Sequence, residues 1–328
     1  MNRINHKLAG LLLIILLALG TTACSEQTSN KVETISYTPV GPTLDRTYRI
    51  TGLYVSNGKA YLPIAGRTDG PLRYAQISDG ETSSTPYKII DLMIPQDANY
   101  KLVGSLFIES VTDRFYAPVV VTGSATNTYT WLLYDSKGLA PIGPALGNYS
   151  VPSNPEFQFG VSAPGFYKNV IYPNYAGNLV GINTMNGQKV FQKSGLLTPT
   201  QNNYAVVENQ LLSFSRDSKN MVLTNMSDGS TKSVGGNLNV LAENGYQATP
   251  FFAFFNGNVY LLTVGSGFEL GLCITSLQSS QGWQCKHSDL ALSEGSQITA
   301  FTVDTGSGTP YFLTNKPMYG TQLNKITQ

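Results

Sequence analysis

The chain contains 328 residues with an almost balanced charge, 21 basic against 20 acidic. Charged residues form only 12% of the sequence, about half of the usual share, whereas Gly, Tyr and Phe are abundant at 32, 19 and 14 copies. This composition excludes intrinsic disorder, a coiled coil and a helical bundle, and it predicts an all-β fold. No basic cluster is present, which excludes nucleic-acid binding because phosphate neutralisation needs one.

The first 23 residues are predicted to be a signal peptide. Arg3 and Lys7 form its positive start, and residues 8–19 form an apolar run of 12 residues, too short to span a bilayer comfortably. Cleavage would remove both basic residues and leave 19 basic and 20 acidic residues, a net charge of −1.

The segment GTTAC, which ends at Cys24, resembles the lipobox of bacterial lipoproteins, although Thr21 stands where that family prefers Leu. The resemblance implies that the sulfur and the amine of Cys24 carry acyl chains and that residues 24–31 form a polar tether. Ser25, in place of Asp, implies sorting to the outer membrane, as in lipoproteins of enterobacterial type. The alternative is ordinary secretory cleavage after Ala23.

The first expected strand covers residues 32–40, VETISYTPV, and its side chains alternate. Glu33, Ile35 and Tyr37 lie on one side of it. An edge strand that packs on a neighbour needs Ile35 and Tyr37 two residues apart, whereas a solvated tether does not.

Six hairpins recur along the rest of the chain, each with an apolar strand, a turn at Asn or Asp, and a second apolar strand containing an aromatic residue. The turns are 40 to 56 residues apart. The pairs Asn57–Gly58 and Asn256–Gly257 are strong hairpin signals because both central residues of a type I′ turn need positive φ. The six turn residues are Asn57, Asp113, Asn169, Asn209, Asn256 and Asp304.

A third strand is expected after each hairpin, and weaker fourth strands such as PYKIIDLM, KVFQKS and WQCKHSDL follow. Four short strands in about 45–50 residues are typical of a β-propeller blade. Residues 32–328 therefore resemble the β-propeller superfamily, and the expected fold is one domain, a six-bladed β-propeller of four-stranded blades. A β-sandwich with chance similarity is the alternative.

The sixth repeat ends after its third strand, TQLNKITQ, at the C-terminus. An unpaired edge there would promote aggregation. We therefore expect residues 32–40 to pair with this C-terminal segment and to supply the missing outer strand.

Finer resemblances to propeller families are limited. The chain has no Trp-Asp dipeptide, so it does not resemble a WD40 protein. INTMNGQKVF, residues 182–191, is similar to the turn of quinoprotein-type blades, which also occurs in the lipoprotein propeller of the outer-membrane β-barrel assembly machinery. Asn183 and Phe191 replace the Asp and Trp of that turn, and that family usually has eight blades.

If Cys24 carries lipid, Cys273 and Cys285 remain as an even pair, which predicts a disulfide in an exported protein. It would join the third and fourth strands of the fifth repeat. Two buried free thiols are the alternative.

Catalytic and metal chemistry has few candidates. His287 is the one histidine left after removal of the signal peptide, and a single histidine excludes imidazole-rich zinc or copper sites. It lies on an expected outer strand, which is a poor position for the histidine of a Ser-His-Asp triad. Strand-end carboxylates could hold Ca²⁺ or Mg²⁺, although Asp at a turn also bonds its own backbone. These carboxylates are Glu109, Asp113, Glu208 and Asp304.

Long loops are expected between the repeats, at residues 91–103, 141–158, 194–204 and 236–249, and the turn TGSATNTYT is also long. Aromatic residues on loops over a rigid scaffold suit the recognition of a protein or a glycan. The alternative is that they cover the junctions between blades. The candidate ligand-face residues are Tyr100, Tyr129, Tyr149, Phe157, Tyr204 and Tyr246.

These features together predict a non-enzymatic binding or assembly scaffold, without cofactor or metal, that is anchored to the outer membrane and faces the periplasm or the cell surface. Its partner would be an envelope protein or a glycan. The alternatives are a metal-dependent hydrolase or lactonase of propeller type and a surface-displayed adhesin or antigen.

Overall fold

The computed structural model groups Ile35–Gln328 into one compact unit. It describes residues 34–65, 71–95, 100–102, 106–109, 112–123, 125–135, 138–152, 164–199, 201, 203–215, 217–243, 245–278 and 282–327. The leader, Cys24 and the tether lie outside the described residues, so their roles stay predictions. The described part is nearly all β, with one short helix, α2 (Asn239–Glu243), which confirms the all-β part of the expected fold.

The first four repeats each form a separate sheet. The first sheet contains β2 (Tyr54–Ser56), β3 (Lys59–Ile64), β4 (Leu72–Ser78) and β5 (Lys88–Leu92). The second contains β6 (Tyr100–Leu102), β7 (Phe107–Glu109), β8 (Arg114–Thr122), β9 (Thr126–Asp135) and β10 (Leu146–Pro152). The third contains β11 (Gly165–Tyr167), β12 (Val170–Tyr172), β13 (Asn174–Tyr175), β14 (Asn178–Asn183) and β15 (Lys189–Ser194). The fourth contains β16 (Tyr204–Val207), β17 (Gln210–Phe214), β18 (Asn220–Asn225) and β19 (Thr231–Asn237).

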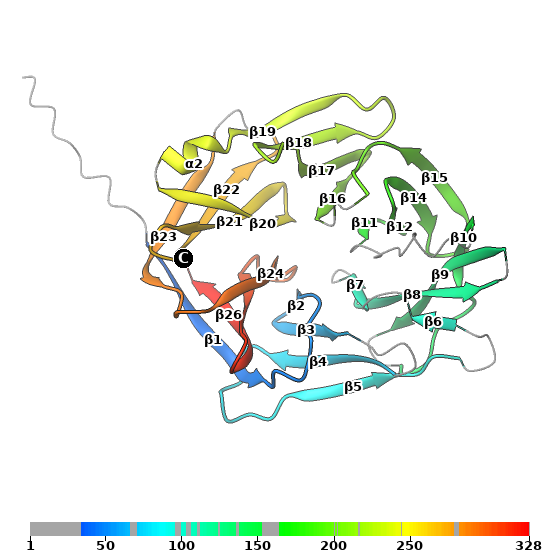
Figure 1. The fold of residues 1–328 in the computed structure, drawn as a ribbon, viewed down its shortest axis with the longest axis horizontal. Coiled ribbons are helices and arrows are strands. Elements are labelled where there is room, and N and C mark those ends of the chain that lie inside the picture. Colours follow the sequence, from blue (N-terminus) through cyan, green and yellow to red (C-terminus); the bar gives the residue numbers. More distant parts are fainter. Residues whose placement is uncertain are drawn as a thin grey trace, which may run out of the picture. The chain divides into compact units, whose positions relative to one another are not determined.

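The fifth and sixth repeats share one eight-stranded sheet. The fifth repeat is β20 (Tyr246–Phe255), β21 (Asn258–Gly265), β22 (Glu269–Ser276) and β23 (Gln284–Ala291). The sixth is β24 (Gln297–Val303), β25 (Pro310–Lys316) and β26 (Gly320–Thr327). Strand β1 (Thr34–Leu44) lies between β23 and β26 and joins the two repeats (Figure 1).

All six predicted hairpins are present, and each predicted turn residue lies between the paired strands. Asn57 and Gly58 have φ values of 50° and 73°, and Asn256 and Gly257 have 48° and 79°, as a type I′ turn requires. In the third and fourth hairpins the positive φ falls one residue earlier than predicted, on Lys168 and Glu208.

A repeated hydrogen bond fastens each of four hairpin turns to the end of the third strand. A backbone N–H just after that strand donates to the carbonyl of the second turn residue. The four bonds are Asp79 to Gly58, Thr184 to Asn169, Met226 to Asn209 and Leu277 to Gly257, with N···O distances of 2.6, 2.8, 3.0 and 3.0 Å. The repeats seen in the sequence are therefore repeats of backbone geometry.

The pairing of the N-terminal strand with the C-terminal strand is confirmed. β1 runs antiparallel to β26, with Ser36 opposite Thr327 and Val40 opposite Leu323 (Figure 1). Ile35 is 3% exposed, and the Tyr37 ring packs edge-on to Phe312 with centroids 5.5 Å apart. The structure extends the strand beyond the predicted end, to Leu44, and gives it a second neighbour in β23.

Six clusters of buried apolar side chains fill the spaces between the repeats. Five of them each join two repeats that are consecutive in sequence, from one and two through to five and six. The last joins repeat six to repeat one, where Val40 and Leu323 belong to the same cluster as Leu62. Each sheet is therefore covered on both faces, which explains why charged residues are scarce.

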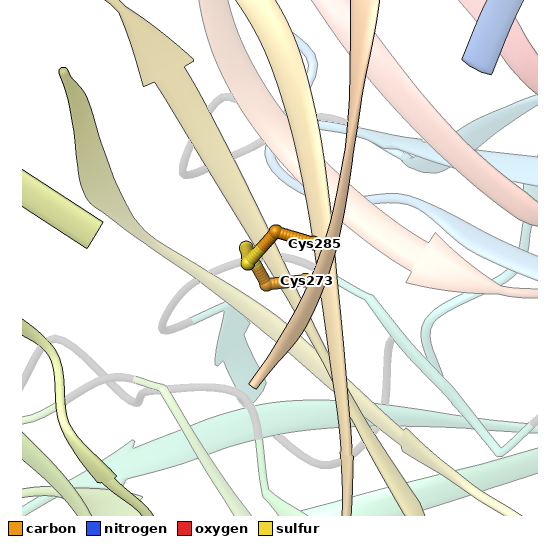
Figure 2. The surroundings of a disulfide bond; sticks show 2 residues. All are labelled: Cys273 and Cys285. Atoms are coloured by element: carbon orange, nitrogen blue, oxygen red, sulfur yellow. A yellow bond between two sulfur atoms is a disulfide. The ribbon is translucent and has the colours of Figure 1, made fainter. Parts of the chain in front are cut away.

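The predicted disulfide is also present. Cys273 on β22 lies directly opposite Cys285 on β23, and their sulfur atoms are 2.02 Å apart (Figure 2). The Cα atoms are separated by 4.0 Å. The link joins the third and fourth strands of the fifth repeat, as the sequence predicts.

Three of the expected loops contain regular structure instead. Residues 91–103 include strand β6, which begins at Tyr100. Residues 141–158 include strand β10, and residues 236–249 include helix α2 and the start of β20. Tyr129 lies within strand β9 and not in a turn. β10 forms because the outer edge of β9 needs backbone partners, and Gly147, with φ of 60°, allows the bulge between Leu146 and Tyr149.

Candidate functional site

The predicted ligand-face residues do not form one surface. Tyr129 and Tyr204 are buried, 5% and 7% exposed, and they pack in the cores between repeats, so a docking ligand cannot reach them. Tyr100, Tyr149 and Tyr246 are partly exposed. Phe157 lies outside the described residues.

Contacts of these tyrosines explain their positions. The Tyr149 ring stacks on Tyr175 with centroids 4.5 Å apart and planes 5° apart. The Tyr175 hydroxyl accepts a 2.8 Å bond from Nε1 of Trp131, and burial raises the pKa of Tyr175 well above its ordinary value. The Tyr204 hydroxyl donates 2.7 Å to the carbonyl of Tyr172. These three contacts join β10, β9 or β16 to the third sheet, so they hold neighbouring repeats together.

His287 lies on the outer strand β23, as expected. Its ring stacks on Tyr246 with centroids 3.6 Å apart, and burial lowers the pKa of the imidazole. Nδ1 of His287 and Oγ1 of Thr263 are buried without a hydrogen-bond partner among the described residues. Both atoms lie over Gly271, where an added Cβ would come within 2.2 Å of Thr263 Oγ1. Thr263 is 0% exposed, so its hydroxyl, although near the imidazole, cannot meet a substrate.

Two of the four candidate carboxylates, Glu109 and Asp304, are engaged by hydrogen bonds, whereas Oδ1 of Asp113 is buried without a hydrogen-bond partner among the described residues. Glu109 accepts bonds from Thr112 Oγ1 at 2.6 Å and from the Tyr116 hydroxyl at 3.1 Å. Asp304 is 2% exposed and accepts from the backbone N–H of Gly306 and from Ser307 Oγ. Across the described residues, no group of three His, Cys, Asp or Glu side chains is placed to hold a metal ion.

A groove that the sequence did not indicate lies at the seam between the fifth and sixth repeats. It encloses about 360 Å³. One wall is the face of β1, β25 and β26 that carries Tyr37, Thr43 and Asn324, and the other is the segment after β23 that carries Ser293. Lys316 and Tyr319 stand at the β25–β26 hairpin. These six residues define what we call the seam groove.

Hydrogen bonds hold the floor of the seam groove in place. Thr43 Oγ1 donates 2.7 Å to Oε1 of Gln322, whose Nε2 donates 3.2 Å to the carbonyl of Val40. Nδ2 of Asn324 donates to Thr314 Oγ1 at 3.1 Å and to the Gln322 carbonyl at 3.2 Å. No hydrogen bond within the described residues engages Oδ1 of Asn324, which remains an acceptor at the groove.

The rim of the seam groove is aromatic. Tyr319 is 75% exposed, and the Lys316 ammonium lies over its ring, 5.6 Å from the centroid. The sequence predicted the last strand, β26, correctly. It did not indicate that the polar face of this strand lies beside the segments around residues 40 and 293. The exposed Met318 and Tyr319 in the turn KPMYG were the one local signal.

A second hollow, of about 450 Å³, lies between the β13–β14 turn and the segment after β15. Its side chains are small or aliphatic apart from Asn178, Ser194 and Thr198, and Asn178 and Ser194 bond to each other. It presents neither a charged nor an aromatic group, so the seam groove is the better candidate.

Comparisons with known proteins identify no family for this chain. Neither a family model nor a curated protein matches the sequence. Among the described residues, no helix has the length and apolar character needed to cross a membrane.

Proposed function

We propose that this chain is a lipid-anchored, six-bladed β-propeller that serves as a non-enzymatic binding or assembly scaffold in the cell envelope. The observation that carries the proposal is the role of β1. It follows directly on the proposed tether and is paired on both sides, with β23 and β26. An anchor at Cys24 would thus attach to a strand held by two repeats.

The six-bladed ring is supported by the order of the cores. Each repeat has four strand positions when β6 and β7, or β12 and β13, are taken as one interrupted strand beside β8 or β14, and when β1 is counted as the fourth strand of the sixth repeat. The cluster between repeats six and one closes the packing order. A sandwich has one core between two sheets, whereas six cores between six repeats suit a propeller.

A binding role is favoured over a catalytic one. The carboxylates of Glu109 and Asp304 are engaged by hydrogen bonds at their hairpin turns, and the hydroxyl near His287, that of Thr263, is fully buried. The seam groove, by contrast, is open and lined by fixed polar groups. A rigid scaffold with a preformed groove binds without a large ordering cost.

The anchoring prediction is tested by Cys24→Ala. Two or more acyl chains hold a protein stably on a membrane, so the variant should leave the membrane pellet and enter the soluble periplasmic or culture fraction. Fractionation after a salt wash, followed by immunoblotting, measures this. Retention of the variant in the pellet would contradict the lipid anchor, and Ser25→Ala serves as the control that should stay bound.

The scaffold role is tested by photocrosslinking in native membranes from Met318, which is 75% exposed beside the seam groove. We expect a discrete crosslinked species that is absent when the probe is moved to Met185, which is 68% exposed on the third repeat. Identical products from both positions would contradict a specific partner at this seam.

A further inference from the structure

The seam groove begins where the core between the fifth and sixth repeats ends. On its inner side, Tyr37 packs against Phe312, and its hydroxyl donates 2.9 Å to the carbonyl of Ala291. This contact closes the apolar core toward the groove. Outward from it the same sheet face carries hydroxyl and amide groups, so the lining changes from apolar to polar along one continuous wall.

The lining has a distinctive chemical composition. It combines tyrosines at its inner end and its rim with Ser, Thr, Asn and Gln side chains and with the apolar Pro39, Ala291 and Leu292, and it contains one cation, Lys316, and no carboxylate. A cationic ligand would find no counter-charge there. A strongly anionic ligand would find a single ammonium, which also lies over the Tyr319 ring. The groove therefore suits a neutral ligand with many hydroxyl groups.

A peptide that binds by strand addition does not fit this position. Such recognition needs an unpaired sheet edge, where the peptide backbone forms the next strand. β1, which forms much of the wall, is already paired with β23 on one side and β26 on the other. The groove thus offers side-chain hydrogen bonds and aromatic surface, with no free strand edge along β1.

We infer that the seam groove binds a neutral oligosaccharide, and that the exposed Tyr319 ring stacks on the C–H face of one sugar. This inference rests on the proposed binding function and names its ligand class. Sugar C–H bonds carry partial positive charge, and the face of an aromatic ring is negative. The Lys316 ammonium lies over one face of the ring, 5.6 Å from its centroid, and the sugar would stack on the opposite face.

Hydrogen bonding at the floor completes the site. Oδ1 of Asn324 accepts from a sugar hydroxyl, and the hydroxyls of Thr43 and Ser293 face the same space. Thr43 and Asn324 are already held by Gln322 and Thr314, so little side-chain freedom is lost on binding. A volume of about 360 Å³ suits a ligand of disaccharide size.

The test uses the full mature protein in a non-glycosidic detergent, with saturation-transfer NMR on three tetrasaccharides: β-1,4-linked glucose, β-1,4-linked N-acetylglucosamine and α-1,4-linked glucose. We expect saturation of sugar ring protons with at least one of them. Tyr319→Ala should weaken its binding about tenfold or more, and Lys316→Ala should weaken it less. Met318→Ala, which changes an equally exposed neighbour outside the lining, should leave Kd unchanged.

Two results would overturn the inference. One is the absence of saturation for all three sugars with the unaltered protein, and the other is equal binding by the Tyr319→Ala variant. If a mixture of random peptides is saturated instead, and Tyr319→Ala abolishes that signal, the groove belongs to a protein partner. In that case the oligosaccharide inference fails while the scaffold function and the Cys24→Ala result stand.

Discussion

Asp304 is the residue that joins the last hairpin turn to the first. Its carboxylate accepts from the Gly306 N–H and Ser307 Oγ in its own turn, and also from the Gly58 N–H of the first repeat at 3.2 Å. The turn at residues 225–230 has the same backbone bonds. There Asn225 takes the position of Asp304, and its side-chain Oδ1 accepts from the Ser227 N–H in its own turn.

We predict that Asp304→Ala lowers the free energy of unfolding by about 1–3 kcal/mol, because it leaves the partly buried N–H of Gly58 without its charged partner. Asn225→Ala is the matched control, since it removes the same turn bond without an inter-repeat contact, and it should cost about 1 kcal/mol or less. Urea unfolding of both variants measures the difference. Equal losses would mean that the contact between the repeats contributes nothing.

His287 makes the stability of the folded protein depend on pH in the acid range. Burial lowers its folded pKa below the unfolded value of about 6.5, so the unfolded chain binds a proton first as the pH falls. The stability that neutral His287 contributes is therefore complete above pH ~6.5 and is lost as the pH falls through the folded pKa. Thermal melts from pH 7.5 to 5 should show a larger drop in Tm for the unaltered protein than for His287→Phe, which keeps the stack on Tyr246. Parallel pH profiles would contradict this.

The disulfide acts within a single element pair, β22 and β23. It closes a loop with a sequence separation of 12, for which the chain-entropy account gives about 3 kcal/mol at most. The double variant Cys273→Ala/Cys285→Ala should lose up to that amount in urea unfolding and should keep its native circular dichroism spectrum. Thiol labelling of the unreduced, denatured protein should modify neither residue. Loss of the fold in the double variant would show that the bond supports more than one hairpin.

The elements that sequence predicted well are those set by local chemistry. Asn-Gly pairs at Asn57 and Asn256 specify a turn whatever surrounds them, and alternating apolar residues identify the strands beside them. β10 was not predicted because the Gly- and Pro-rich sequence of residues 141–158 is typical of a loop. It forms a strand because it pairs with the edge of β9. The seam groove was not predicted for a similar reason, since Thr43, Ser293 and Asn324 meet only through β1.

At the scale of the whole molecule, the first and last strands must meet. Each of the first five repeats contains its own outermost strand, whereas the sixth contributes only β24, β25 and β26. Without β1, the edge of β26 would present unpaired backbone groups, and the cores on both faces of the sixth repeat would lose Ile35, Val40 and Leu44. β1 therefore determines the stability of two inter-repeat cores at once.

Deletion of residues 32–40 should therefore lower Tm sharply and cause aggregation, because loss of Ile35 alone removes a buried side chain whose truncation costs about 2–5 kcal/mol. Deletion of residues 25–31, from the tether, is the control of similar length and should change neither property. Differential scanning fluorimetry and light scattering after size-exclusion chromatography measure both effects. A subtler pair, Ile35→Asp and Thr34→Asp, places the same charge on the buried and on the exposed side of β1, and only the former should destabilise the protein. If the two deletions behave alike, β1 is dispensable and the closed order of six repeats must be abandoned.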